Sequence, residues 1–354
     1  MSAQPLSRGK KIFFTFLLVL FGLVVGIICS ELVLRLTILG NREYENKAVS
    51  FAMHHLRSDP DVGYLWKANL SVDDPPGWYD QEVFPLVTDT NGFFNPAEAV
   101  AMRQNGTPVD IVGLVDSFIH GATYDFFQFF REKGLFFYNM SMSRHCPPQY
   151  NIILEKYALP LHPRWILYGI YENDFDETPD FENWLESSAD WFTFHSGTWF
   201  GPAVHVPPWR AAFERFMPGL SMLEKRVRRQ FGLGPPASYR QVAATALSER
   251  EKAEKVADYI VRASRIAGKA NSSFLCLLIP ARDVDGDGKS GHDFHYTIIT
   301  RILKEKGVPF LDLRRVFGHG PERRELYYVQ DAHWNNRGIL KTAQAVYRAM
   351  EQAR

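Results

Sequence analysis

This sequence has little cysteine and no net charge, and each deficit excludes a class of protein. Its 354 residues include only 3 cysteines, Cys29, Cys146 and Cys276, which lie too far apart to form a CxxC pair. The spacing indicates neither a disulfide framework nor a zinc knuckle. The 40 lysines and arginines balance 40 aspartates and glutamates, so we expect no nucleic-acid partner. Hydrophobic residues make up 46% of the chain, which is typical of a globular protein.

Charge is also missing from one long stretch near the N-terminus. Residues 12–39 are predominantly apolar, and the run is uncharged up to Cys29. About 20 apolar residues cross a bilayer, so we predict a transmembrane anchor at residues 12–39. Three basic residues precede it, so the positive-inside rule predicts that residues 1–11 are cytoplasmic and that the rest is extracytoplasmic. A cleaved signal peptide is the rival interpretation, but no small-x-small cleavage site follows the run.

Beyond the anchor, the chain changes from irregular to periodic. Residues 40–106 contain many turn residues and few periodic runs, so we expect an irregular lead-in packed on the core. In residues 107–354, short apolar runs alternate with helical patterns, which predicts an α/β fold with a parallel, doubly wound sheet. We expect one helix between the first two strands. The expected strands are residues 109–115, 135–140, 165–171, 274–279 and 309–313, and the later helices include residues 148–159, 248–269 and 339–350.

Two segments allow more than one interpretation. An insertion at about residues 175–247 is rich in aromatic residues and suits a lid, a platform for sugar rings or a surface on lipid headgroups, or else a small subdomain core. Its basic stretch 226–229 suits an anionic lipid or substrate, or a solvated helix face. Asp283–Asp287 are spaced like the start of a calcium loop, but Phe294 replaces the expected glutamate, so a polar turn is the alternative.

Ser117 lies where the first expected strand passes into a helix, in the stretch DIVGLVDSFIHG. Sites in open α/β sheets form at the carboxyl ends of the strands. The N–H groups of a helix N-terminus suit a hydroxyl that attacks a carbonyl and leaves an oxyanion. Ser117 is therefore a candidate nucleophile. The alternative is that Asp116 and Ser117 only cap the helix.

Two further loops follow strands of the same sheet and carry polar residues. Asp331 and His333 lie in QDAHWNNRG, beyond the fifth expected strand. At the shared carboxyl edge, His333 can act as a base for Ser117 and Asp331 can orient it. The alternative is a surface histidine beside a helix cap. Asn173, after the third strand, can donate its side-chain amide to an oxyanion.

At these residues the chain resembles the SGNH, or GDSL, hydrolase family, and specifically its membrane-anchored bacterial branch. VDSF is similar to the GDS block, YNMSMSRHCPPQY to the second block, ENDFD to the asparagine block and DAHWNNRG to the end of the family pattern. The Asp-x-His spacing resembles the alginate O-acetyltransferase branch. The resemblance implies a flavodoxin-like three-layer sandwich that needs neither a metal nor an organic cofactor. It implies a Ser117, His333 and Asp331 triad, with Ser117, Arg144 and Asn173 as oxyanion donors.

Two departures from the family pattern bear on activity. Val115 stands where the family has the glycine before the Asp-Ser pair, so we expect it to crowd the turn. Arg144 stands where the family has a glycine whose backbone N–H joins the oxyanion hole. Arginine keeps the N–H but is strained if the position requires a positive φ. Losing one oxyanion donor lowers the rate roughly a hundred- to a thousandfold.

The sequence therefore predicts a membrane-tethered, extracytoplasmic serine esterase or acyltransferase. Its expected substrate is an acyl ester, with acetyl groups on a cell-envelope polysaccharide as the specific case. The expected location is the cell membrane, with a single pass at residues 12–39 and a periplasmic domain if the source is Gram-negative. The alternative, motivated by Val115 and Arg144, is a catalytically degenerate SGNH module that binds a glycan or a protein partner. A lipid esterase is a third interpretation.

Overall fold

The computed structural model describes residues 8–38, 51–77, 82–187, 247–282 and 293–353, except residues 53 and 330, with scattered positions between 209 and 227. The chain divides into two compact units. One unit consists of Met1–Glu45 and Val204–Arg240, and the other consists of Asn46–Ala203 and Gln241–Arg354.

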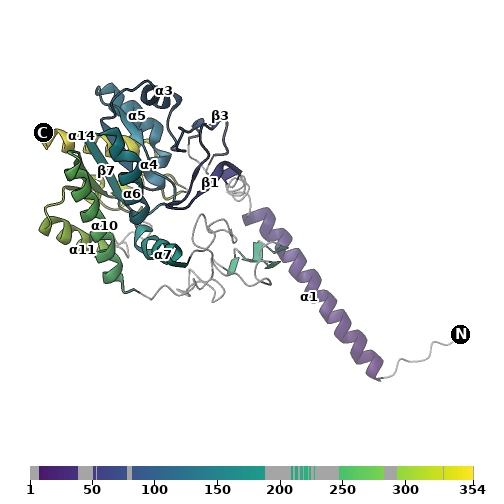
Figure 1. The fold of residues 1–354 in the computed structure, drawn as a ribbon. Helices are drawn as coiled ribbons and strands as arrows, with labels where there is room; N and C mark the ends of the chain where they lie inside the picture. The colour runs from purple at the N-terminus through teal and green to yellow at the C-terminus, as the bar shows by residue number, and fades with distance from the viewer. Residues whose placement is uncertain are drawn as a thin grey trace. The chain divides into compact units, whose positions relative to one another are not determined.

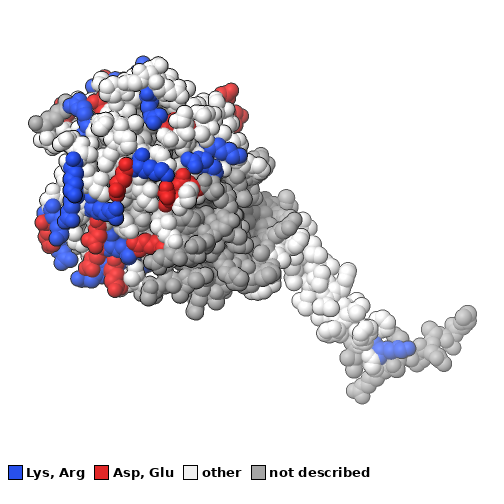
Figure 2. Space-filling model, viewed as in Figure 1, with Lys and Arg blue, Asp and Glu red and all other residues white. Residues whose placement is uncertain are grey.

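The first unit contains the long apolar helix α1 (Arg8–Ile38), drawn in purple in Figure 1. Its stretch Gly9–Leu34 is long and apolar enough to cross a membrane, by length and composition. Figure 2 shows α1 largely free of charged side chains, with basic ones at its N-terminal end. Near its other end, the buried carboxylate of Glu31 accepts hydrogen bonds from the backbone N–H groups of Gly219 and Leu220, both at 2.9 Å.

The second unit is built on a five-stranded sheet with the order β6-β5-β7-β8-β9. All four pairings are parallel, and this is the strand order of flavodoxin-like folds. Each strand lies within two residues of its predicted bounds. The strands are β5 (Ile111–Leu114), β6 (Phe137–Asn139), β7 (Trp165–Ile170), β8 (Ser273–Leu278) and β9 (Phe310–Asp312).

Helices cover both faces of the sheet, so the residues of its central strands are buried. Every residue of β5 and β7 is buried, as a sheet covered on both faces requires. Helix α10 contacts α6 and α11, while α14 contacts α5 and α12, so two helix layers enclose the strands (Figure 1). The predicted α/β three-layer sandwich is confirmed. The helices of this unit include α4 (Ser117–Gly121), α5 (Thr123–Glu132), α6 (Pro147–Ile153), α7 (Asp174–Ser187), α10 (Glu249–Lys269), α11 (Asp293–Glu305), α12 (Leu313–Phe317), α13 (Pro321–Arg324) and α14 (Asn336–Gln352).

The prediction of a single helix between the first two strands is wrong. The chain forms α4 and α5 with a break at Ala122, where φ is −98° and ψ is 11°. The hydroxyl of Thr123 donates to the carbonyls of Ile119 and His120 at the end of α4. Apolar spacing does not reveal the break, because the apolar residues of α4 before it and the phenylalanines of α5 after it both suit a buried helix.

The lead-in is also more regular than expected. It contains the antiparallel pairs β1 (Leu56–Asp59) with β2 (Gly63–Trp66) and β3 (Ser71–Val72) with β4 (Leu86–Val87), followed by α3 (Ala97–Gln104). These strands have 4 residues or fewer, which is too short for clear alternation. The calcium-like stretch Asp283–Asp287, the basic stretch 226–229 and most of the aromatic insertion lie outside the described residues.

Candidate active site

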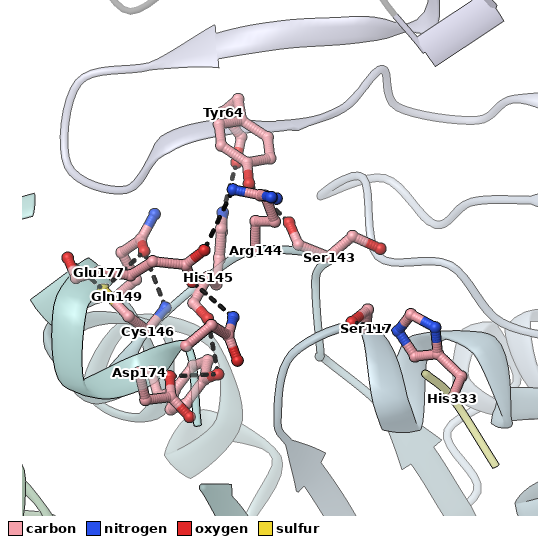
Figure 3. Close-up of polar contacts among 12 residues, drawn as sticks. Tyr64, Ser117, Ser143, Arg144, His145, Cys146, Gln149, Asp174, Glu177 and His333 are labelled. Atoms are coloured by element: carbon pink, nitrogen blue, oxygen red, sulfur yellow. Dashed lines mark hydrogen bonds and ion pairs between the residues drawn. The ribbon is translucent and has the colours of Figure 1, made fainter. Parts of the chain in front are cut away.

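Ser117 is the first residue of α4, just beyond the end of β5. Asp116 precedes it as the N-cap, and its Oδ1 accepts a hydrogen bond from the backbone N–H of Phe118 at 3.0 Å. The helix is therefore capped by Asp116. The side chain of Ser117 instead faces His333, as Figure 3 shows.

Ser117, His333 and Asp331 form one hydrogen-bonded series. Ser117 Oγ lies 2.7 Å from His333 Nε2, and His333 Nδ1 lies 2.6 Å from Asp331 Oδ1. Although 216 residues separate Ser117 from His333, the fold brings them together at the edge where both loops emerge. A hydroxyl, an imidazole and a carboxylate in this order are connected as a nucleophile, its base and the group that orients the base.

The loop that carries His333 is held by several contacts. Arg282 Nη1 donates to the backbone carbonyls of Tyr328 at 2.6 Å, Val329 at 2.7 Å and Asp331 at 3.3 Å. The following helix, α14, is capped by Asn335, whose Oδ1 accepts from backbone N–H groups of its first turn. Asp331 is thus not the helix cap that the alternative interpretation required, and its carboxylate is available to His333.

The charge around His333 suits a base. Burial lowers the pKa of His333, but the hydrogen bond and charge of Asp331 and the charge of Asp116 outweigh burial, so the pKa is raised above 6.5. A pKa near the working pH favours proton transfer in both directions. The ring of Phe118, whose centroid lies 4.9 Å from that of the imidazole, packs against His333.

Val115 fits before Asp116 because Gly169 lies beside it. The β5 and β7 pairing ends with Leu114 opposite Tyr168, one residue before Val115 and Gly169. A Cβ at Gly169 would lie 2.5 Å from Val115 Cγ1 and 2.7 Å from Cγ2. The expected crowding is therefore relieved by the glycine on the neighbouring strand. The backbone N–H of Val115 also donates to Ser141 Oγ at 2.9 Å.

Arg144 occupies the strained conformation that the sequence analysis considered. Its φ is +60°, in the left-handed region that favours glycine. It is the third residue of a turn closed by a hydrogen bond from His145 N to Met142 O at 3.1 Å. For a residue other than glycine, such a conformation costs about 1–3 kcal/mol. The Arg144 guanidinium forms an ion pair with Glu177, with Nη1 and Oε1 3.3 Å apart.

Asn173 contacts the same carboxylate. Its Nδ2 donates to Glu177 Oε2 at 2.7 Å. Glu177 therefore joins two of the predicted oxyanion donors, Arg144 and Asn173. Sequence reasoning missed Glu177, although its spacing of four residues from Asn173 places both on one face of a helix.

Asp116 lies between this group and the Ser117 and His333 pair. Its carboxyl is buried, and burial raises its pKa, while the Phe118 N–H, the charge of His333 and the amide of Asn173 act in the opposite direction. The negative charge of Asp116 acts on both His333 and Glu177. The predicted site residues thus form two groups that interact through Asp116.

A cleft open to solvent adjoins Ser117 and His333. Phe84 and Tyr328 contribute aromatic rings to its lining, and Glu82 and Asp125 contribute carboxylates. Burial and the nearby charge of Glu82 raise the pKa of Asp125. No pattern in the sequence indicated these lining residues.

Three histidine and cysteine side chains away from Ser117 have structural roles. His295 Nε2 lies 2.7 Å from Glu249 Oε2, and the free thiols of Cys146 and Cys276 are buried. Within the part of the chain that the structure describes, no group of three or more histidine, cysteine, aspartate or glutamate side chains is placed to hold a metal ion.

Comparison with known proteins finds a family model that matches the C-terminal third of the chain. Residues 239–354 match the family model described as SGNH hydrolase-like domain, acetyltransferase AlgX. This segment contains Asp331 and His333 but neither Ser117 nor Asn173. The sequence matches none of the curated proteins with which it was compared.

Several solved structures are similar to the chain at low identity. A GDSL-like lipase from Bacteroides thetaiotaomicron is 11% identical with a TM-score of 0.43, over 73% of this chain and 99% of that chain. The acetyl xylan esterase AlAXEase is 11% identical with a TM-score of 0.40, over 68% and 99%. A catalytic mutant of the acetylxylan esterase Axe2 from Geobacillus stearothermophilus is 10% identical with a TM-score of 0.38, over 68% and 93%.

Proposed function

We propose that the protein is a serine esterase or O-acyltransferase, from the premise that residues 239–354 match the model of an SGNH hydrolase-like domain. The observation that carries the proposal is the series from Ser117 Oγ through His333 to Asp331, with distances of 2.7 and 2.6 Å. A serine hydroxyl is a weak nucleophile until a base accepts its proton, and this series supplies that base.

In the proposed reaction, Ser117 Oγ attacks the acyl carbon of an ester while His333 Nε2 takes the hydroxyl proton. Asp331 accepts a hydrogen bond from Nδ1 and stabilises the imidazolium. The carbonyl oxygen becomes an oxyanion, for which the backbone N–H groups of Ser117 and Arg144 and the amide of Asn173 are the proposed donors. The imidazolium then protonates the leaving alcohol, and water or an acceptor hydroxyl resolves the acyl-serine.

We propose an acetyl ester of a cell-envelope polysaccharide as the substrate. Phe84 and Tyr328 in the cleft offer rings on which a sugar can pack. The carboxylates of Glu82 and Asp125 offer acceptors for sugar hydroxyls. Turnover should therefore be fastest with acetyl esters and should fall with chain length, whereas a preference for long acyl chains would indicate a lipid esterase.

We also propose that α1 anchors the chain in a membrane, with the N-terminus cytoplasmic and the second unit extracytoplasmic. The apolar stretch Gly9–Leu34 and the basic residues Arg8, Lys10 and Lys11 at its N-terminal end support this topology. Carbonate extraction should leave the protein in the membrane fraction. A C-terminal tag should be digested by protease added to spheroplasts, and a protected tag would reverse the topology.

A fluorophosphonate probe tests the activity directly on the detergent-solubilised full chain. Ser117→Ala should abolish labelling, and His333→Ala should reduce it strongly, because only a serine with a working base reacts readily. Ser143→Ala is the matched control, since Ser143 lies near the site but its Oγ faces His120 Nδ1 at 3.4 Å. This control should label like the wild type.

The competing function is a binding module that retains the fold without catalysis. The observation that favours it is that position 144, a proposed oxyanion donor, holds an arginine where the family pattern has a glycine. If the wild-type chain is folded by circular dichroism and takes up no probe, the binding module is the better interpretation. Ser117 would then serve only as the first residue of α4.

A further inference from the structure

Glu177 is a largely buried carboxylate that connects two loops of the site. It is the fourth residue of α7, and its side chain is 20% exposed. Oε2 accepts from Asn173 Nδ2 at 2.7 Å, and Oε1 lies 3.3 Å from Arg144 Nη1. Figure 3 shows Glu177 at the start of α7, on the side of the site away from His333. Asn173 follows β7 and Arg144 follows β6, so one carboxylate holds residues from two separate strand ends.

The hydrogen bond from Asn173 fixes the direction of its amide. A side-chain amide nitrogen carries two hydrogens, and Glu177 accepts one of them. Because the amide is planar, the position of the first hydrogen determines where the second one points. An oxyanion donor has to be aimed in advance, since a donor that rotates freely stabilises developing charge less well.

The contact with Arg144 fixes a backbone donor in a similar way. The strain of its left-handed conformation, about 1–3 kcal/mol, favours a change of backbone angles that would redirect the N–H. The ion pair with Glu177 restrains the Arg144 side chain and so opposes this change. Since the guanidinium is 40% exposed, the pair contributes little energy, and its effect is on direction.

We propose that Glu177 is a positioning residue that, in its ionised form, holds both Asn173 and Arg144 as oxyanion donors. This inference rests on the proposed function, because the donors matter only if Ser117 forms an acyl intermediate. Glu177 touches neither the substrate nor the reacting atoms, and it acts through the two residues that it orients.

The surroundings of Glu177 place its titration near neutral pH. Burial raises the pKa of Glu177 to about 7; Arg144 and the amide of Asn173 oppose the rise, and Asp116 and Asp180 add to it. Acidification therefore protonates the carboxylate and removes the ion pair with Arg144. The titratable and charged groups that face Glu177 are Tyr64 on β2, Asp116 beyond β5, Arg144 and Cys146 beyond β6, and Asp174 and Asp180 on α7.

The pH dependence of kcat/KM for 4-nitrophenyl acetate tests this role on the full chain. In the wild type, both His333 and Glu177 must lose a proton, so log kcat/KM should fall in acid toward a slope of two. Glu177→Gln removes one titration and should give a slope of one, which loss of a merely structural contact would not produce. Above both pKa values, Glu177→Gln should also lose activity, because a neutral side chain, like protonated Glu177, neither pairs with Arg144 nor accepts from Asn173 as strongly as the carboxylate does. Glu177→Ala should lose roughly a hundredfold, as expected for a misplaced oxyanion donor.

Glu182→Gln is the matched control on the same helix. Glu182 forms an ion pair with Lys255 at 2.6 Å and accepts from the hydroxyl of Tyr259 at 2.7 Å, and both of these partners lie on α10. This variant should keep the wild-type rate and a slope of two.

The outcomes separate this inference from the proposed function. If Ser117 reacts with fluorophosphonate but Glu177→Gln keeps a slope of two, or Glu177→Ala turns over at the wild-type rate, the positioning role is refuted and the esterase remains. If the folded wild type neither labels nor turns over, the proposed function fails and this inference fails with it. If Glu177→Ala does not fold, the slope of Glu177→Gln still decides.

Discussion

The contact between Val115 and Gly169 allows a prediction that can be worked from distances. A Cβ at Gly169 would lie 2.5, 2.7 and 3.2 Å from the Cγ1, Cγ2 and Cβ atoms of Val115, and real Cβ atoms essentially never approach within 3.0 Å. Valine has a stiff χ1, so its methyl groups cannot turn away easily. Gly169 lies in the central strand β7, paired with β8, and Val115 lies one residue beyond the end of β5. Gly169→Ala should therefore overpack the sheet directly below Ser117.

The expected magnitude is a balance of two terms. An alanine at 169 restricts the unfolded chain and stabilises the protein by about 0.4–1 kcal/mol. Overpacking a filled core costs about 1–3 kcal/mol, and the approach of 2.5 Å to a stiff side chain favours the upper part of that range. We expect a net loss of about 1–2 kcal/mol. For a domain of this size the melting temperature should fall by roughly 2–8 °C.

A double-mutant cycle isolates the contact. Val115→Ala alone should destabilise by about 2 kcal/mol, because it deletes two buried methyl groups. In the Val115→Ala and Gly169→Ala double variant, the new methyl group enters the space that valine left, so the loss should be smaller than the sum by about 1–2 kcal/mol.

Thermal unfolding of the detergent-solubilised full chain, followed by tryptophan fluorescence, measures all of these variants. Gly268→Ala in α10 is the matched control, since a Cβ there meets nothing within 4 Å and should stabilise the helix. Wild-type stability for Gly169→Ala, or a double variant as unstable as the sum, would refute the claim that Gly169 accommodates Val115.

Three further predictions concern the chemistry. Arg144→Gly relieves the backbone strain but removes the cation that lowers the pKa of Glu177. The acid limb of kcat/KM should therefore move to higher pH, and the rate at pH 9 should be no lower than in the wild type. An unchanged acid limb would contradict the role of the ion pair. Asp331→Asn removes the group that raises the pKa of His333. Probe labelling should be slower than in the wild type but faster than in His333→Ala, and the acid limb of labelling should move to lower pH. A shift of the acid limb to higher pH would contradict this role of Asp331. Asn173→Ala should lower ester turnover roughly a hundredfold while Ser117 still labels to completion, and wild-type turnover would remove the amide from the oxyanion hole.

The sheet could be predicted because each of its strands is a short apolar run between helical patterns. The WILYGI run of β7 contains no charged residue, as a strand buried on both faces requires. Parallel pairing then places all the strand ends at one edge, which is why Ser117, Asn173 and the loop of His333 could be assigned to one site before any contact was known.

Other parts of the site could not be predicted, because packing decides them. Glu82 comes from a segment without periodicity and enters the cleft only through the folding of the lead-in on the core. Asp125 follows the break at Ala122, and the apolar spacing does not reveal that break. The spacing of four residues between Asn173 and Glu177 did indicate that the two side chains are neighbours. The ion-pair partner of Glu177, Arg144, could not be predicted because it lies 33 residues earlier, in a turn.

The structural surroundings of Val115 and Arg144 weaken the case for a binding module. Gly169 leaves room for the side chain of Val115, so valine can stand there without displacing the backbone that leads to Ser117. The strain at Arg144, about 1–3 kcal/mol, exceeds what a partly exposed ion pair returns, about 0–1 kcal/mol. Glu177 therefore does not explain why the left-handed conformation exists, and the turn with the buried His145 has to impose it. A binding module has no use for an N–H held in this direction, whereas an oxyanion hole requires one. Strain retained at that position, with a carboxylate restraining the same residue, is expected where the direction of the N–H has a function.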